Sequence, residues 1–176
     1  MSNRLIIISD LWGFANAQWI SVYTNVLDAN YKIELYDTRA LAEVDQSLTE
    51  QSLIHKKFVD GGIDTAVGNL LTAEQGSVSV LAFSIGGTIA WKAALNGLKI
   101  DHLYAVSATR LRLETQKPNG KVSLFYGDHD INRPDENWFK MLMLDPVTFK
   151  QAEHNLYENT PRALEISNFI NHKAKK

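Results

Sequence analysis

The chain has 176 residues, of which 45% are hydrophobic and 22% are charged, and its formal net charge is −2 at pH 7. This composition is typical of a single globular domain, residues 1–176, and the interspersed charges form no basic stripe for nucleic acid or an anionic membrane. The chain contains no cysteine, which excludes disulfides, thiolate metal sites and a cysteine nucleophile.

The first elements predicted are a strand, a helix and a second strand. The apolar run over residues 4–9 is typical of a buried strand. This run is too short for a signal peptide or a membrane span, so we expect a cytoplasmic protein without a membrane partner. Apolar residues at helical spacing predict an amphipathic helix over residues 16–29. Polar and apolar residues alternate over residues 31–36, and this segment is more polar than the first strand, as in an edge strand.

The next segment predicts a loop and two helices. Residues 37–49 are polar and lack a period, which favours a loop. Helical patterns follow near residues 50–59 and 63–73. Gly61 and Gly62 lie between them and favour an interruption of the helix.

The centre of the chain combines a strand, a tight turn and a helix. Residues 78–83 are short and apolar, as in a buried parallel strand, and the pattern becomes helical after Gly86. A strand that turns into a helix within about one residue forces positive φ at the turning residue, Ser84. Its neighbours two positions away must then be small, and Ala82 and Gly86 meet this requirement.

Strands and helices continue to alternate to the end of the chain. Strands are predicted over residues 100–106, 122–126 and 147–152, with a helix over residues 134–144. A final helix is predicted with Thr160 as its N-cap and Pro161 at its first position. This alternation implies a three-layer α/β/α sandwich around a mostly parallel sheet of about six strands.

The pentapeptide Ala82-Phe83-Ser84-Ile85-Gly86 resembles the nucleophile elbow of the α/β-hydrolases, G-x-S-x-G, with alanine in place of the first glycine. The resemblance covers nearly the whole chain but begins at the family's third strand. It therefore implies a minimal α/β-hydrolase fold without the first two strands. The segment 107–121 is too short to hold the helical cap that many members insert there.

The resemblance also implies a catalytic triad in the chain order serine, acid, histidine. Ser84 is the expected nucleophile. The acid is expected in the loop after the fifth strand, where Asp130 matches the family's Gly-x-x-Asp and Asp128 is the alternative. His154, just after the last strand, is the expected base, since the other four histidines lie on predicted helices, at the start of a strand or beside the acid.

An acyl-transfer site also needs donors for the oxyanion. The resemblance implies the backbone N–H groups of Ile85, directly after the nucleophile, and of Trp12, in the loop after the first strand. In that loop Asp10 and Leu11 replace the family's histidine and first glycine, which leaves its conformation open. Trp12 and Phe14 are expected either to line the acyl pocket or simply to cover the sheet.

These features favour a serine hydrolase that cleaves an ester or thioester of a small acyl substrate. The segment 6–19 is similar to carboxylesterases that act on pimeloyl methyl esters, which is an alternative substrate class. A second alternative is a non-catalytic protein of the same fold that binds a ligand or partner. No metal-ligand spacing and no nucleotide-binding loop is present, so we expect no metal or other cofactor. The sequence does not define the oligomeric state.

Overall fold

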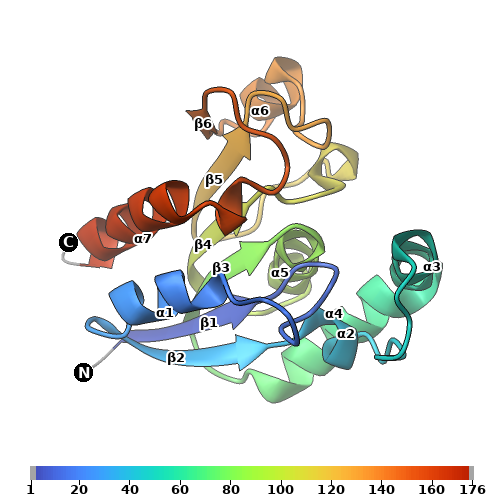
Figure 1. The fold of residues 1–176 in the computed structure, drawn as a ribbon. Coiled ribbons are helices and arrows are strands. Elements are labelled where there is room, and N and C mark those ends of the chain that lie inside the picture. The colour runs from blue at the N-terminus through green and yellow to red at the C-terminus, as the bar shows by residue number, and fades with distance from the viewer. Residues whose placement is uncertain (1–2, 175–176) are drawn as a thin grey trace.

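A computed structural model describes residues 3–174 as a six-stranded sheet with helices on both faces (Figure 1). The strand order is β2-β1-β3-β4-β5-β6, and every neighbouring pair is parallel. This architecture confirms the predicted α/β sandwich with six strands. Because all strands run the same way, their carboxyl ends lie along one edge of the sheet, where α/β proteins place their sites.

The strands are β1 (Asn3–Ile8), β2 (Tyr31–Tyr36), β3 (Val78–Phe83), β4 (Ile100–Val106), β5 (Lys121–Gly127) and β6 (Val147–Phe149). The helices are α1 (Ile20–Leu27), α2 (Thr38–Leu41), α3 (Gln51–Lys57), α4 (Ile63–Ala73), α5 (Ile85–Leu95), α6 (Glu136–Met141) and α7 (Thr160–Ala174). A kinked segment at Phe58–Gly62 joins α3 to α4, and short 3-10 helices form at Leu111–Leu113 and Leu156–Glu158. No helix within residues 3–174 has the length and apolar composition needed to cross a bilayer.

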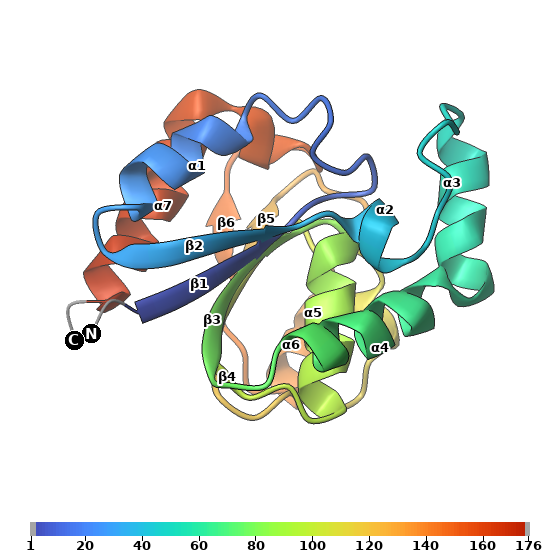
Figure 2. The same cartoon turned by 90° about the horizontal axis from the view of Figure 1, so that it is seen from below.

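The two faces of the sheet have separate hydrophobic cores. Helices α1 and α7 lie side by side on one face, and α4, α5 and α6 cover the other (Figures 1 and 2). Successive residues of a strand point to opposite faces. In β1, Leu5 and Ile7 therefore pack toward α1 and α7, while Ile6 and Ile8 pack toward α4 and α5. Burial on both faces explains why the central strands are apolar without alternation.

The structure differs from the predicted elements between β1 and α3. Helix α1 begins at Ile20 rather than at residue 16, because residues 14–19 form successive hydrogen-bonded turns, such as the one from the Ala17 N–H to the Phe14 carbonyl (3.2 Å). The predicted loop 37–49 contains the short helix α2. The Asp37 carboxylate accepts the Arg39 and Ala40 N–H groups and so caps this helix.

Three further element boundaries also differ from the prediction. Helix α6 is shorter than predicted because Asp135 accepts the Trp138 N–H at 2.8 Å and so begins the helix there. Strand β6 ends at Phe149, since positive φ at Gln151 turns the chain away. Thr160 lies inside α7, and the cap contact comes from Asn159, whose Oδ1 accepts the Arg162 N–H at 3.3 Å.

The predicted interruption between α3 and α4 is confirmed. Asp60 and Gly61 have non-helical backbone angles, and Gly61 has φ 129°. An L-residue is strained at this angle, whereas glycine adopts it readily. The kink turns α3 away from α4 and lets it extend past the carboxyl edge of the sheet (Figure 2).

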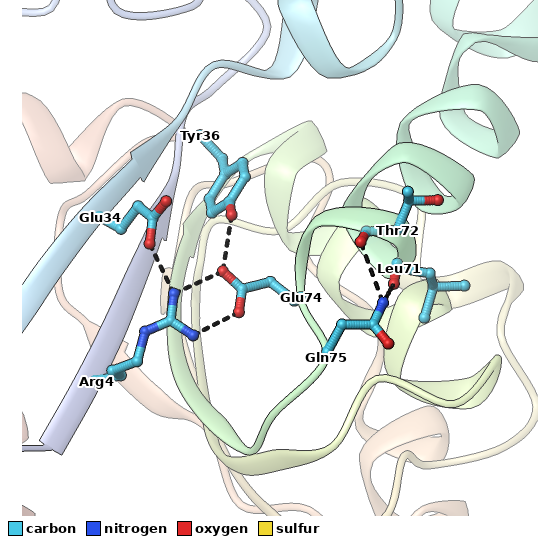
Figure 3. A network of polar contacts seen from close by, with 7 residues as sticks. All are labelled: Arg4, Glu34, Tyr36, Leu71, Thr72, Glu74 and Gln75. Carbon is cyan, nitrogen blue, oxygen red and sulfur yellow. Dashed lines mark hydrogen bonds and ion pairs between the residues drawn. The ribbon is translucent and has the colours of Figure 1, made fainter.

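A polar network ties the amino end of β1 to the end of α4 (Figure 3). Arg4 Nη1 and Nη2 donate to the two carboxylate oxygens of Glu74 at 2.7 and 2.9 Å, and the Tyr36 hydroxyl donates to the same carboxylate at 2.7 Å. The Glu74 side chain is 1% exposed. Glu34 also accepts from Arg4, at 2.6 Å, but its side chain is 53% exposed. Glu74 is therefore the buried member of this network.

We expect Glu74→Gln to lower the free energy of unfolding by about 1–3 kcal/mol, because an amide has one acceptor oxygen and its NH2 group would face a donor, either Arg4 Nη1 or, if the amide is flipped, Arg4 Nη2 and the Tyr36 hydroxyl. Glu34→Gln is the matched control and should cost under about 0.5 kcal/mol, as exposed ion pairs do. Urea denaturation of the two variants measures both values. Equal losses would show that burial of Glu74 adds nothing.

Candidate active site

Ser84 lies at the sharp turn between β3 and α5. Its backbone has φ 51° and ψ −120°, which a non-glycine residue adopts only under strain. A Cβ atom added at Gly86 would lie 2.3 Å from the Ser9 carbonyl oxygen, so only glycine lets α5 begin this close to the end of β1. The structure thus has the strand-turn-helix geometry that the small residues around Ser84 predicted.

The neighbouring strand β4 holds this turn in place. The Ser84 N–H donates to the Val106 carbonyl at 3.0 Å, and the Ser84 carbonyl accepts the Thr109 N–H at 3.2 Å. Both backbone groups of the strained residue are therefore satisfied by the end of β4 and the segment that follows it. This pairing fixes the direction of the Ser84 side chain.

Ser84, His154 and Asp130 form a continuous hydrogen-bonded chain. Ser84 Oγ lies 2.9 Å from His154 Nε2, and His154 Nδ1 lies 3.1 and 3.0 Å from the two carboxylate oxygens of Asp130. The Asp130 side chain is fully buried, whereas that of His154 is 31% exposed. A carboxylate can only accept, so the Nδ1 atom carries the proton and Nε2 is left to accept from the serine hydroxyl.

The alternative acid, Asp128, lies elsewhere in the same loop. Its Oδ1 accepts the Ala152 N–H at 3.3 Å, and its carboxylate lies 4.0 Å from Lys150 Nζ. Within residues 3–174, Asp128 makes no hydrogen bond to His154. The two loops meet at Gly127, where an added Cβ atom would lie 2.0 Å from the Ala152 carbonyl oxygen.

The loop after β1 holds a hydrogen bond to one of the expected oxyanion donors. The Trp12 N–H, predicted as an oxyanion donor, donates to Asp10 Oδ1 at 2.9 Å. This is the common turn in which an aspartate side chain accepts the N–H two residues later. The Tyr157 hydroxyl donates to the other oxygen of Asp10 at 3.0 Å. Burial raises the pKa of Asp10, and the two hydrogen bonds oppose that shift.

Two backbone donors near Ser84 remain free of protein acceptors. The Ile85 N–H is the first of α5, where helices leave their N–H groups without partners. The Leu11 N–H precedes the occupied Trp12 N–H. Among residues 3–174, neither group has a hydrogen-bond acceptor, and both residues line the same cleft as Ser84.

This cleft has a volume of about 640 Å³. Trp12 lines it and is 43% exposed. Phe14 does not line it, and instead packs against the core under α1. The opposite wall comes from α3, which contributes Gln51, Ser52 and His55. The sequence pattern identified α3 as a helix but not as part of the site, and it gave no role to His55.

Further polar side chains reach the cleft from the segments after β4 and β5, namely Thr109, Arg110, Arg112 and Asn132. None of these residues was predicted, because no motif marks them. In residues 3–174, no group of three or more acidic or histidine side chains is placed to hold a metal ion.

No protein-family model matches the sequence, and no curated protein matches it significantly. Solved structures do match. Est1E from Butyrivibrio proteoclasticus, with ferulic acid bound, is 15% identical with a TM-score of 0.71, over 99% of this chain and 90% of that one. A dienelactone hydrolase-like promiscuous phosphotriesterase from metagenomic libraries is 13% identical with a TM-score of 0.71, over 97% and 86% of the two chains.

A Xanthomonas campestris protein assigned to the α/β superfamily of hydrolases is 14% identical with a TM-score of 0.67, over 97% of this chain and 99% of that one. At identities this low, the similarity shows a shared fold and gives no information about the substrate of this chain. This chain therefore has the fold of the α/β-hydrolase superfamily.

Proposed function

We propose that the protein is a serine hydrolase that cleaves a carboxylic ester or thioester of a small acyl substrate through an acyl-enzyme. The observation that carries this proposal is the chain of contacts from Ser84 Oγ to His154 Nε2, at 2.9 Å, and from His154 Nδ1 to Asp130, at 3.0 Å. A serine hydroxyl needs a base within this distance, and the base needs an orienting group.

In the first half-reaction, Ser84 Oγ attacks the carbonyl carbon of the substrate while its proton passes to His154 Nε2. The resulting imidazolium is stabilised by the buried Asp130 carboxylate. When the tetrahedral intermediate collapses, the bond to the alcohol or thiol breaks. The leaving group takes the proton from Nε2, and the acyl group stays on Ser84.

The negative oxygen of the intermediate needs donors that are already in position. The Ile85 N–H is one, at the positive end of the α5 dipole. We assign the second role to the Leu11 N–H in place of the Trp12 N–H, because Asp10 occupies the Trp12 group. In this assignment, Asp10 is a positioning residue that holds the loop so that the Leu11 N–H faces the cleft.

The second half-reaction repeats these steps with water. A water molecule gives its proton to His154 Nε2 as its oxygen attacks the acyl carbon, and Ser84 recovers the proton when the acid leaves. His154 is reachable for this water, since its side chain is 31% exposed.

A fluorophosphonate probe tests the proposal directly, because it labels only an activated serine. We expect stoichiometric labelling of the native protein at Ser84, found by mass spectrometry of the modified peptide, and none in Ser84→Ala. A folded protein that remains unlabelled would instead be a non-catalytic binding protein of this fold.

A further inference from the structure

Two arginines on the wall of the cleft lack an acidic partner. Arg110 and Arg112 both line the cleft that contains Ser84. Neither guanidinium makes an ion pair or side-chain hydrogen bond with any residue in the range 3–174, whereas Arg4 pairs with Glu74 and Arg133 pairs with Glu136 at 2.6 Å. The cleft therefore holds two cations that the rest of the protein leaves uncompensated.

The segment that carries these arginines is firmly held. The Thr109 N–H donates to the Ser84 carbonyl, the Thr88 hydroxyl donates to the Thr109 carbonyl, and the Tyr126 hydroxyl donates to the Ala108 carbonyl at 2.8 Å. Arg110 itself has φ 59°, an angle that costs a non-glycine residue conformational energy. Directly after Thr109, the backbone of Arg110 is thus fixed relative to the nucleophile.

No acidic group in the cleft competes for these cations. Asp10 is the one carboxylate among the residues that line it in the described chain, and its two oxygens accept from Trp12 and Tyr157. The α3 wall adds only the polar side chains Gln51, Ser52 and His55.

Outside the cleft, Asp135 places a carboxylate in the pocket next to Arg112. Its carboxylate caps α6 through the Trp138 N–H.

We propose that the substrate carries an anionic group, a carboxylate or phosphate, that Arg110 and Arg112 bind while Ser84 attacks the ester carbonyl. This inference rests on the proposed function and names its substrate class: an ester or thioester with a negative charge on its acyl or alcohol part. Guanidinium groups suit this role, because their fork of N–H donors matches the oxygens of a carboxylate or phosphate.

The test compares kcat/KM, after subtraction of the uncatalysed rate, for pairs of esters in which one member carries a free carboxylate and the other carries its methyl ester. On the alcohol side, the pair is para-acetoxybenzoate and its methyl ester. On the acyl side, the pair is para-nitrophenyl hemiglutarate and para-nitrophenyl methyl glutarate. We expect the anionic member of at least one pair to be favoured about tenfold, and the preference to fall as salt is added. Para-acetoxyphenyl phosphate, compared with para-acetoxybenzoate, decides between phosphate and carboxylate.

Variants assign the preference to the two arginines. In the double variant Arg110→Gln, Arg112→Gln, the ratio of anionic to neutral kcat/KM should fall to about one. Lys32→Gln is the matched control for charge, because Lys32 is exposed near the amino end of β2. It should keep the full ratio. Equal rates on both members of each pair, or a preference that survives in the double variant, would overturn the inference.

A binding measurement separates this inference from the proposed function. In Ser84→Ala, calorimetry should detect binding of glutarate or inorganic phosphate, and adding the double arginine substitution should abolish it. If the native protein hydrolyses none of the esters but this binding difference remains, the proposed function fails and anion recognition stands. If the esters are hydrolysed but neither anion binds and no preference appears, only the inference fails.

Discussion

Ser84→Ala is expected to abolish hydrolysis of activated aryl esters, with a fall in kcat of up to about 10⁶-fold, the effect of removing the nucleophile from a serine protease triad. The structural reason is that Ser84 Oγ is the hydroxyl that lies within 2.9 Å of His154 Nε2. Release of para-nitrophenol from para-nitrophenyl acetate measures the loss.

The control for Ser84→Ala is thermal stability. Ser84 is 5% exposed, but Oγ makes its one hydrogen bond within residues 3–174 to His154, and the turn is held by backbone bonds to β4. The variant should therefore melt within a few degrees of the native protein. A folded variant that retains substantial ester turnover would show that another group is the nucleophile.

Asp130→Asn is expected to lower kcat by about 10⁴-fold, as the same change does in a serine protease. The asparagine amide would favour the wrong tautomer of His154, with the proton on Nε2, where it cannot accept from Ser84. The measurement is kcat on the same aryl ester across a range of pH values.

Asp128→Asn is the matched control for that variant, since it makes the same chemical change in the same loop. Asp128 contacts the Ala152 N–H and lies near Lys150, without a hydrogen bond to His154. Its loss should change kcat by less than about tenfold. The opposite ranking of the two variants would assign the acid role to Asp128.

The sequence predicted the fold well because two signals mark each central strand. One is the apolar run of the strand itself, and the other is the helical spacing of apolar residues in the segment that follows. Ala82 and Gly86 were enough to predict the turn at Ser84, since only small residues fit around a positive φ angle. The family's chain order then pointed to His154 and to the loop after β5, where the family's Gly-x-x-Asp favoured Asp130 and left Asp128 as the alternative. The structure brings His154 and Asp130 together with Ser84, and their catalytic roles stay predictions.

The loop after β1 could not be predicted in the same way. A family motif assigns the second oxyanion donor to Trp12, but the motif has no carboxylate at the position of Asp10. Once that side chain is present, a two-residue turn through Asp10 Oδ1 takes up the Trp12 N–H. Local hydrogen-bond chemistry thus overrides the alignment.

The α3 wall and the two arginines were missed for a different reason. The helical pattern near residues 50–59 predicts that α3 forms. It does not predict the direction that the kink at Gly61 gives to this helix. Arg110 and Arg112 follow a strand end in a segment without periodicity. Only the tertiary structure shows that these side chains line the same cleft as Ser84.

The parallel sheet separates the ion pair between Arg4 and Glu74 from the residues that surround the cleft. Arg4 and Glu74 lie at the amino edge, whereas Ser9, five residues after Arg4 and directly after the end of β1, lies close to Gly86 at the start of α5. At 3.3 Å per residue, the two regions are about 16 Å apart. Substitutions this far apart have additive free energies of unfolding where they share no partner. Tyr36 is the exception, because its hydroxyl donates to Glu74 and its carbonyl accepts the Ser9 N–H at 3.1 Å. The amino edge can therefore be redesigned for a more stable scaffold while the cleft is varied independently for new substrates.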